Sequence, residues 1–338
     1  MLVQYGHTVM REITIFAGSA HPELAREIGA YLGLPLNPTT IQRFSNDCLY
    51  VQMNENCREA DVFIVQPLVT PVHEHLMELL FMLDAARGAS AARLTAVIPY
   101  YAYARSDKKD APRISIAGRL VADLLATAGA NRVLTMTLHA PQVHGFFSVP
   151  TDHMNALGVL ARHFRQYDLS NTVVVSPDLG NAKSASHFAD LIHTPVAAGS
   201  KKRLSDDRVV IDTIVGDVRG KDVIVLDDEI ANGGTVIEIL QRLRERDVQQ
   251  IRIACTHGLF TGKAIERLSA QTEVAEIVTT NTVPIPAHKR LPNMTILSIA
   301  PLLAETIRRN HNGESVSNLL ADSDESSITL PRKSSVRP

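Results

Sequence analysis

The chain has 338 residues, of which 45% are hydrophobic and 21% are charged, a composition that supports a sizeable buried core and is typical of globular proteins. Its 34 lysines and arginines nearly balance its 36 aspartates and glutamates, which excludes a strongly basic nucleic-acid-binding protein and a disordered acidic chain. We therefore expect no nucleic-acid partner, and any positive charge that serves phosphate binding must be local.

The three cysteines, Cys48, Cys57 and Cys255, are widely separated and form no CxxC pair. This spacing argues against a disulfide framework and against a zinc site. The first 20 residues contain Arg11 and Glu12 and no long apolar stretch, and no later segment reaches the roughly 18 apolar residues of a membrane span. We expect a cytoplasmic protein that makes no contact with a membrane.

Short apolar runs rich in β-branched residues alternate along the chain with segments of helical spacing. The runs are Ile13 to Phe16, Val62 to Val65, Leu94 to Ile98, Val133 to Met136, Val173 to Val175, Val223 to Leu226, Ile251 to Ala254, and Ile277 with Val278. Helical spacing appears in Leu76 to Leu83, Leu120 to Leu125 and Val236 to Leu243. Runs that are apolar on both faces are typical of buried parallel strands. The alternation predicts the α/β class with parallel sheets.

The chain is too long for one simple doubly wound sheet, so we expect two α/β domains of similar size, covering residues 11–153 and 154–320. The last segment, residues 321–338, is rich in serine and charged residues. This composition predicts a flexible tail.

The segment from Ala104 to Asp110 carries three cations within five residues and follows a strand and a tyrosine-rich turn. A charge run of this kind is usually solvated surface. On a loop that closes over a ligand, the same cations neutralise charge on phosphates and exclude water. The residues alone leave both interpretations open.

Two polar residues follow predicted strands directly. His139 comes after the run that ends at Met136, and Asp178 comes after the run that ends at Val175. Ligand-binding groups in parallel α/β sheets gather at the carboxyl ends of strands, so both are candidates for a site. A lone histidine at a strand end is more often structural, and this alternative also stays open.

A basic segment, Gly199 to Arg203, follows the predicted strand Val196 to Ala198. It is either an exposed basic turn or a source of positive charge for phosphoryl-type transfer, which depends mainly on positioning and electrostatic stabilisation.

The strongest single pattern of the chain comes after this segment: Val223 to Thr235 is a buried strand with two acids and a glycine-rich turn that opens a helix. Backbone N–H groups and a threonine hydroxyl at a helix start bind phosphate well, and the acid pair suits ribose hydroxyls or hydrated Mg²⁺.

Several further segments, in the same order along the chain, resemble the ribose-phosphate pyrophosphokinase (PRPP synthetase) family from about Phe16 to Leu320. They are Arg43 to Ser45, Met77 to Leu80, Ile98 to Arg105, Leu138 to Phe147, Val175 to Asp178 and Leu302 to Glu305. The resemblance implies two phosphoribosyltransferase-type domains, each with a mainly parallel sheet flanked by helices. The nucleotide side lies in the first domain and the ribose 5-phosphate side in the second.

The resemblance also implies a reaction: transfer of diphosphate from ATP to the 1-hydroxyl of ribose 5-phosphate, with Mg²⁺, giving PRPP and AMP. It implies a homo-oligomer, a hexamer in the family, because the nucleotide site is completed between subunits.

The site residues implied by the resemblance fall into four groups. Lys201 and Arg203 are catalytic, and His139 and Asp178 are Mg²⁺ ligands. The nucleotide-binding residues are Phe44, Asn46, Arg105, Ser106, Asp107 and Lys109. The ribose 5-phosphate-binding residues are Asp227, Asp228, Asn232, Gly233, Gly234 and Thr235.

The chain departs from the family's usual residues at several of these positions. Asn46 and Cys48 stand where the family has the Asp and Glu that read adenine, and Ser106 stands where it has a glutamine. In the ribose-phosphate loop, Ala231 and Asn232 replace an Asp and a Thr. Thr137 replaces an Asp that lies two residues before the site histidine. Neither Asn46 nor Cys48 replaces a carboxylate in full, so we expect looser nucleotide selectivity.

Two other functions stay open on the sequence alone. The first is a catalytically weak paralogue that regulates a PRPP synthetase; the lost acids favour it and the retained Lys201 and Arg203 oppose it. The second is a phosphoribosyltransferase that consumes PRPP, which leaves the segments around Arg105 and His139 without a role.

Overall fold

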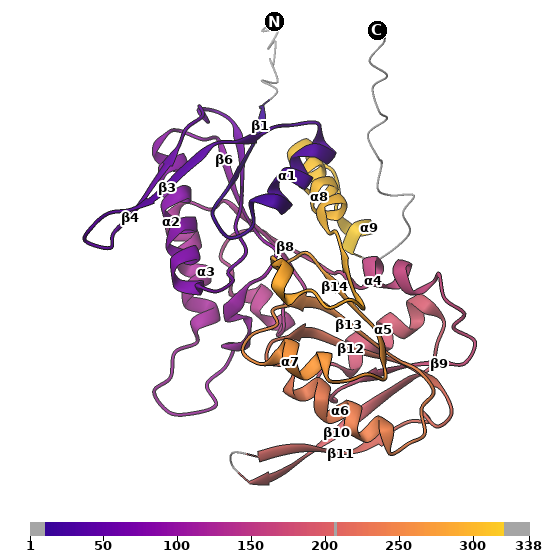
Figure 1. Cartoon of the computed structure of the whole chain (residues 1–338). Coiled ribbons are helices and arrows are strands. Elements are labelled where there is room, and N and C mark those ends of the chain that lie inside the picture. The colour runs from indigo at the N-terminus through magenta and orange to yellow at the C-terminus, as the bar shows by residue number, and fades with distance from the viewer. Residues whose placement is uncertain (1–10, 206–207, 321–338) are drawn as a thin grey trace, which may run out of the picture.

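The computed structural model describes residues 11–205 and 208–320, with the backbone alone for residues 201–205, 208–212 and 320. Two α/β halves lie one beside the other along the long dimension of the molecule (Figure 1). The predicted α/β class, with two mainly parallel sheets flanked by helices, is confirmed. The predicted tail, residues 321–338, lies outside the described residues.

The sheet of the N-terminal half is parallel throughout and has the strand order β2-β1-β5-β6-β7-β8. The strands are β1 (Ile13–Ala17), β2 (Leu36–Asn37), β5 (Asp61–Val65), β6 (Arg93–Ile98), β7 (Arg132–Met136) and β8 (Thr151–Met154). A separate antiparallel hairpin is formed by β3 (Thr39–Arg43) and β4 (Leu49–Met53). This hairpin packs on α2 and projects from the body of the molecule (Figure 1).

Alternate residues of β5 explain how this sheet is covered on both faces. Val62 and Ile64 pack against α2 (Val72–Gly88) and α3 (Ala117–Ala128). Phe63 and Val65 face α1 (Pro22–Leu32) on the other side.

One detail of α3 differs from what its leucine spacing suggests. Its buried residues are Gly118, Val121, Ala122 and Leu125. Leu120 and Leu124 are 53% and 38% exposed, and both lie on the side of α3 away from the sheet.

The sheet of the C-terminal half has the order β11-β10-β9-β12-β13-β14-β15. Its strands are β9 (Thr172–Ser176), β10 (Val196–Ser205), β11 (Arg208–Val215), β12 (Asp222–Ile230), β13 (Ile251–Gly258), β14 (Val274–Thr280) and β15 (Met294–Leu297). All neighbours are parallel except β10 and β11, which form a long antiparallel hairpin. Helices α4 (Leu157–Phe164) and α5 (Ala182–Ile192) cover one face, and α6 (Gly234–Arg244) and α7 (Ala264–Ser269) cover the other.

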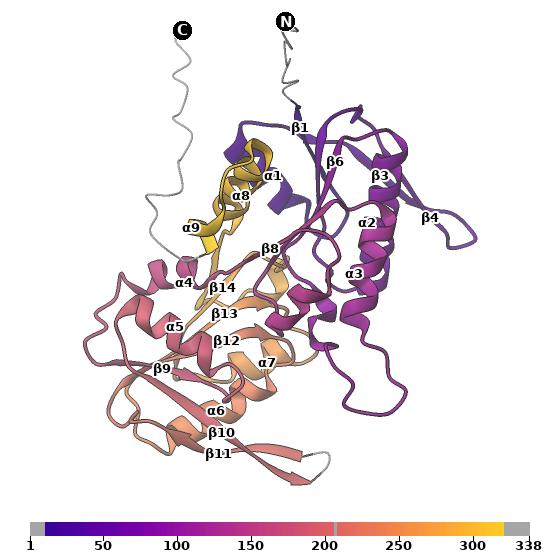
Figure 2. The same cartoon turned by 180° about the vertical axis from the view of Figure 1, so that it is seen from behind.

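The chain then returns to the N-terminal half. Helix α8 (Ala300–Asn312) lies beside α1 in both views, and the short α9 (Ser317–Leu320) follows it (Figures 1 and 2). Leu303 and Ile307 of α8 are fully buried in the same core as Leu24 and Ile28 of α1. The domain boundary between residues 153 and 154 stays a prediction. The structure shows in addition that residues 299–319 complete the core of the N-terminal half.

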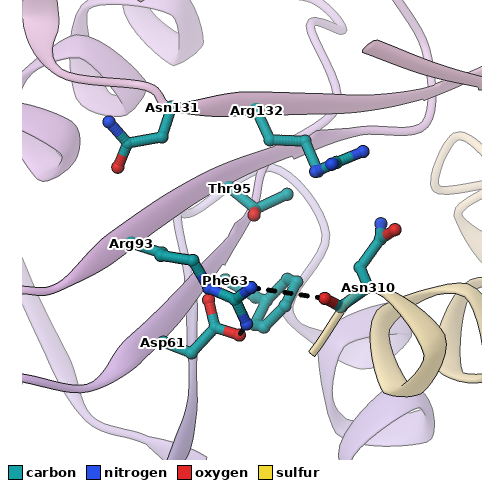
Figure 3. A pocket seen from close by; sticks show the side chains of 7 residues that line it. All are labelled: Asp61, Phe63, Arg93, Thr95, Asn131, Arg132 and Asn310. Atoms are coloured by element: carbon teal, nitrogen blue, oxygen red, sulfur yellow. Dashed lines mark hydrogen bonds and ion pairs between the residues drawn. The ribbon is translucent and has the colours of Figure 1, made fainter. Parts of the chain in front are cut away.

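Polar contacts fasten the end of α8 to the sheet, at the strand ends opposite the loops described below (Figure 3). The buried carboxylate of Asp61 pairs with Arg93 and accepts a hydrogen bond from His311 Nδ1 at 2.9 Å. Asp152 accepts hydrogen bonds from Arg132 at 2.7 Å and from Asn310 at 2.8 Å. A cavity of about 130 Å³ lies between these groups.

No helix within residues 11–205 and 208–320 is both long enough and apolar enough to span a bilayer.

Candidate active site between the two halves

Loops at the carboxyl ends of strands from both halves meet at one place. His139 follows β7 of the N-terminal half, and Asp228 lies near the end of β12 of the C-terminal half. His139 Nδ1 donates a hydrogen bond to Asp228 Oδ2 at 2.7 Å, although 89 residues separate them. The predicted nucleotide and ribose segments are therefore in direct contact.

The two predicted sugar-loop acids have opposite electrostatic character. Burial, followed by the charge of Asp228, raises the pKa of Asp227 well above its usual value. Burial also acts to raise the pKa of Asp228, but the hydrogen bond and charge of His139 outweigh it and lower that pKa to about 2. The hydrogen bond to Asp228 raises the pKa of His139. Asp228 is therefore charged near neutral pH, where it can accept hydrogen bonds from a sugar hydroxyl.

The sequence interpretation ended the strand at these acids, but β12 continues to Ile230. Glu229, which received no role, is buried and lies on this extension. Its Oε1 pairs with Arg105 at 2.6 Å, and its Oε2 accepts a hydrogen bond from Tyr100 at 3.2 Å. A third consecutive acid after the apolar run Val223 to Leu226 was the signal that could have identified it.

Asp178 lies where it was predicted, just after β9 and before α5. Its Oδ1 accepts the backbone N–H of Asn181 at 3.0 Å, and its carbonyl accepts the hydroxyl of Ser176 at 2.6 Å. The side chain of Asn181 donates to the carbonyl of Leu226 on β12 at 3.1 Å. These bonds hold the Asp178 loop beside the acid-bearing strand.

The predicted phosphate loop opens α6 as the sequence pattern suggested. Gly233 is the residue before the helix and has φ of 76°, a conformation that glycine adopts without strain. Asn232 Oδ1 accepts the N–H of Gly234 at 2.9 Å, and Arg267 donates to the carbonyl of Asn232 at 3.1 Å. Together with Thr235, this turn presents the start of an 11-residue helix, where backbone N–H groups and the helix dipole favour an anion.

The predicted triphosphate loop extends between η1 (Ala102–Arg105) and α3. Ser106 closes its base, since its hydroxyl accepts the N–H of Ala117 at 3.0 Å and donates to the carbonyl of Ser115 at 3.3 Å. Asp107 accepts a hydrogen bond from Gln142, which lies near His139 in the sequence. Lys109 is exposed on the loop.

The predicted adenine-reading residues do not join this cluster in the same chain. Phe44 is 52% exposed, with its ring 5.6 Å from Tyr50, and lies at the tip of the β3–β4 hairpin. Asn46 Oδ1 accepts the N–H of Cys48 at 3.3 Å within that tip. Within the described part of the chain, neither Phe44 nor Asn46 forms a hydrogen bond or ion pair with His139, Arg105 or Asp228.

Lys201 and Arg203 lie on β10, in the portion that pairs with β11. Their side chains lie outside the description. The preceding part of β10 pairs with β9, with Ala198 opposite Ser176, so the backbone of Lys201 continues from the strand next to the Asp178 loop.

No group of three or more metal-binding side chains comes together among the described residues. The roles of His139 and Asp178 as Mg²⁺ ligands therefore stay predictions. Their chemistry fits a nucleotide-bound ion: one carboxylate and one half-exposed imidazole, whose Nδ1 is engaged by Asp228, leave most of the coordination to phosphate oxygens and water, as Mg²⁺ prefers.

Thr137, one of the departures noted above, has a structural role. It adopts a positive φ of 41°. Its N–H donates to the carbonyl of Met154 at 2.8 Å, and its own carbonyl accepts a hydrogen bond from His257 at 3.0 Å. It thereby joins the end of β7 to β8 and to β13 of the other half.

Comparison with known proteins extends over nearly the whole chain. A family model described as the N-terminal domain of ribose phosphate pyrophosphokinase matches residues 13–129, and one described as the phosphoribosyl synthetase-associated domain matches residues 205–321. A relative from Streptomyces coelicolor is 67% identical over 92% of this chain and 98% of its own length.

Two further matches carry informative names. A Deinococcus radiodurans protein named ribose-phosphate pyrophosphokinase is 49% identical over 91% of this chain and 97% of its own. The crystal structure of phosphoribosylpyrophosphate synthetase from Mycobacterium smegmatis has a TM-score of 0.85 and 42% identity, and the match covers 90% of this chain and all of that one.

Proposed function

Because this chain belongs to the ribose-phosphate pyrophosphokinase family, we propose that it transfers the diphosphate group of ATP to the 1-hydroxyl of ribose 5-phosphate, giving PRPP and AMP. The observation that supports this most strongly is the contact of His139 with Asp228 at 2.7 Å, because it joins a segment expected to bind the nucleotide to the strand expected to bind the sugar.

The two substrates are assigned to opposite sides of this contact. The turn from Asn232 to Thr235 at the start of α6 binds the 5-phosphate, and Asp227 and Asp228 face the ribose hydroxyls. Arg105, Asp107 and Lys109, together with Ser106 at the loop base, bind the triphosphate from the other half. The strand ends of β7 and β12 thus hold the 1-hydroxyl near the β-phosphorus, the arrangement that in-line displacement needs.

The chain's own residues contribute to the electrostatic stabilisation. Lys201 and Arg203, on the long β10–β11 hairpin, place positive charge on the phosphates being separated. His139 and Asp178 would hold Mg²⁺ together with the triphosphate, and the bound ion would neutralise part of the phosphate charge. Asp228, charged near neutral pH, orients the sugar by accepting hydrogen bonds from its hydroxyls.

We further propose a homo-oligomer, with the family's hexamer as the expected assembly. The α2–α3 apolar face, defined as Met77, Phe81, Leu120 and Leu124, consists of residues that are between 38% and 53% exposed on two neighbouring helices. An exposed apolar face of this kind marks a protein interface. The projecting hairpin then carries Phe44 and Asn46 to the nucleotide of a neighbouring subunit, which explains why they lie apart from their own chain's cluster.

The cytoplasm is the proposed location, since all three cysteines are unpaired thiols, as a reducing compartment maintains them.

The test is AMP release by the purified protein with Mg²⁺, ATP and ribose 5-phosphate, with a parallel reaction that lacks the sugar. We expect AMP and PRPP in equal amounts, and only in the complete reaction. AMP formed without the sugar indicates simple hydrolysis. If no AMP forms above the control, the chain is the regulatory paralogue instead, and it should then alter the activity of a genuine synthetase mixed with it.

A further inference from the structure

Glu229 is a buried carboxylate at the centre of the proposed site, and nothing above gives it a task. Its side chain is 4% exposed. It is the third consecutive acid of β12, after Asp227 and Asp228. A carboxylate at this depth is maintained only with partners, because burying a charge without compensation is costly.

Both of its partners come from the other half of the molecule. Arg105 pairs with Oε1 at 2.6 Å, and the hydroxyl of Tyr100 donates to Oε2 at 3.2 Å. Tyr100 is buried, and its ring packs edge-on against His257 at a centroid distance of 4.9 Å. The Glu229 carboxylate is therefore fixed in position, and burial raises its pKa.

Arg105 is different, because its side chain remains 54% exposed. A guanidinium group has five N–H donors, and the pair with Glu229 does not use them all. Arg105 ends η1, at the base of the loop proposed to cover the triphosphate, so its exposed part borders that loop. Arg105 can therefore bind a phosphate oxygen without leaving Glu229.

Two arrangements are conceivable when the nucleotide binds. Arg105 either stays on Glu229 and uses its free donors, or leaves Glu229 for the phosphates. If Arg105 left, the buried carboxylate of Glu229 would lose its ion-pair partner while lying next to Asp228, and burying a charge without a partner is energetically costly. The first arrangement avoids this cost.

We propose that Glu229 is a positioning residue for the nucleotide: it holds the guanidinium of Arg105 at the junction of the two halves, so that the remaining N–H groups meet the triphosphate. This inference rests on the proposed function, in which Arg105 binds ATP. It deepens that function by assigning the orientation of Arg105 to an acid on the ribose side.

The main variant is Glu229→Gln, which keeps the size of the side chain and its bond from Tyr100 but removes the charge. We expect the KM for ATP to rise about tenfold, the typical effect of losing one charge-assisted hydrogen bond, while the KM for ribose 5-phosphate changes less than twofold. In an Arg105→Ala background, the same change should have no further effect on ATP, because the two residues act as one unit.

The matched control is Glu305→Gln. Glu305 is also a 4% exposed carboxylate paired with arginines, Arg308 and Arg309, but it lies on α8, away from the site. It should lower the melting temperature and leave the KM for ATP unchanged. If Glu229→Gln does not fold, Glu229→Asp replaces it: the shorter carboxylate draws Arg105 back and should also raise the KM for ATP.

Titration calorimetry of Mg²⁺ and ATP in the absence of the sugar separates this inference from the proposed function. If the wild-type chain releases no AMP, the function fails, yet weaker ATP binding by Glu229→Gln still supports the positioning role. The inference is overturned if the variant binds ATP as tightly as the wild type or more tightly, because the pair with Glu229 then does not help Arg105 bind the nucleotide. It is also overturned if the variant weakens ATP binding equally in the Arg105→Ala background.

Discussion

Lys201 is the residue whose loss should affect chemistry most directly. We expect Lys201→Ala to lower kcat by at least about 100-fold, because removing one preorganised charge or donor from a transfer site costs roughly 10²–10³ in rate. Lys221→Ala is the control, since Lys221 lies just before the start of β12, far along the strand from Asp227 and Asp228, and pairs with Asp217. Steady-state kinetics on both variants checks this, and circular dichroism shows whether the fold persists. A Lys201 variant that retains most of its kcat would remove the residue from the mechanism.

His257 should make the fold sensitive to mild acid. Burial lowers its pKa to about 4, whereas an unfolded histidine titrates near 6.5. Above pH 6.5 the imidazole is neutral in both states and its contribution to stability is complete. As the pH falls from 6.5 to 4, the unfolded chain binds a proton that the folded chain does not, so stability falls, by roughly 3 kcal/mol at most.

Urea unfolding of the wild-type chain and of His257→Gln between pH 7 and pH 4 measures this contribution. The variant should lose less stability than the wild type over the range, with exposed His288→Gln as the control. Parallel curves for all three proteins would show that folding does not lower the pKa of His257.

For individual residues, the sequence predicted which side chains lie at strand ends but not which side chains they contact. The positions of His139, Asp178 and the 227–235 turn followed from strand-end and helix-start patterns, which are local. The bond from His139 to Asp228 and the pairing of Arg105 with Glu229 link residues 89 and 124 positions apart. No local pattern encodes such distances, so these contacts depended on the arrangement of the two sheets.

The elements themselves were predicted well wherever a buried parallel strand gives a continuous apolar run. β8 and the β3–β4 hairpin were missed, because Thr151 to Met154 holds three polar residues and only one apolar residue, and the hairpin is half exposed. The return of α8 to the first sheet was also missed. Its apolar spacing indicates a helix but does not say which sheet the helix covers.

The fastening of α8 can be tested at Asp61. Asp61→Asn removes a buried charge that binds both Arg93 and His311. We expect a loss of roughly 2 kcal/mol, below the 3–5 kcal/mol typical of a fully buried pair because Arg93 is 36% exposed. Asp84→Asn is the control, since its pair with Arg87 is exposed on both sides and should contribute about 0.5 kcal/mol or less.

Urea unfolding measures both variants, and hydrogen exchange locates the effect. Amides of α8 should exchange faster in Asp61→Asn and at the wild-type rate in Asp84→Asn. Faster exchange confined to α3 would assign the loss to the other face of the sheet.

The assembly depends on the α2–α3 apolar face. We expect Leu120→Glu with Leu124→Glu to shift the protein to smaller species in sedimentation velocity, because two charges cannot be buried in an apolar contact without cost. Activity should fall with assembly, since Phe44 and Asn46 would no longer reach a neighbouring nucleotide. Val215→Glu, at a position 60% exposed on β11, is the control. If the double variant keeps the wild-type sedimentation coefficient, subunits contact each other through another face.

The return of α8 also governs how the chain can fold during its synthesis. Residues 11–154 leave the ribosome first and include every strand of the first sheet, yet one face of that sheet keeps an apolar strip beside α1 until residues 299–307 arrive to cover it. The second sheet, residues 172–297, is complete before then. The half that is made first is therefore the half that is finished last, and its uncovered strip is the part of the nascent chain that a holdase chaperone would bind.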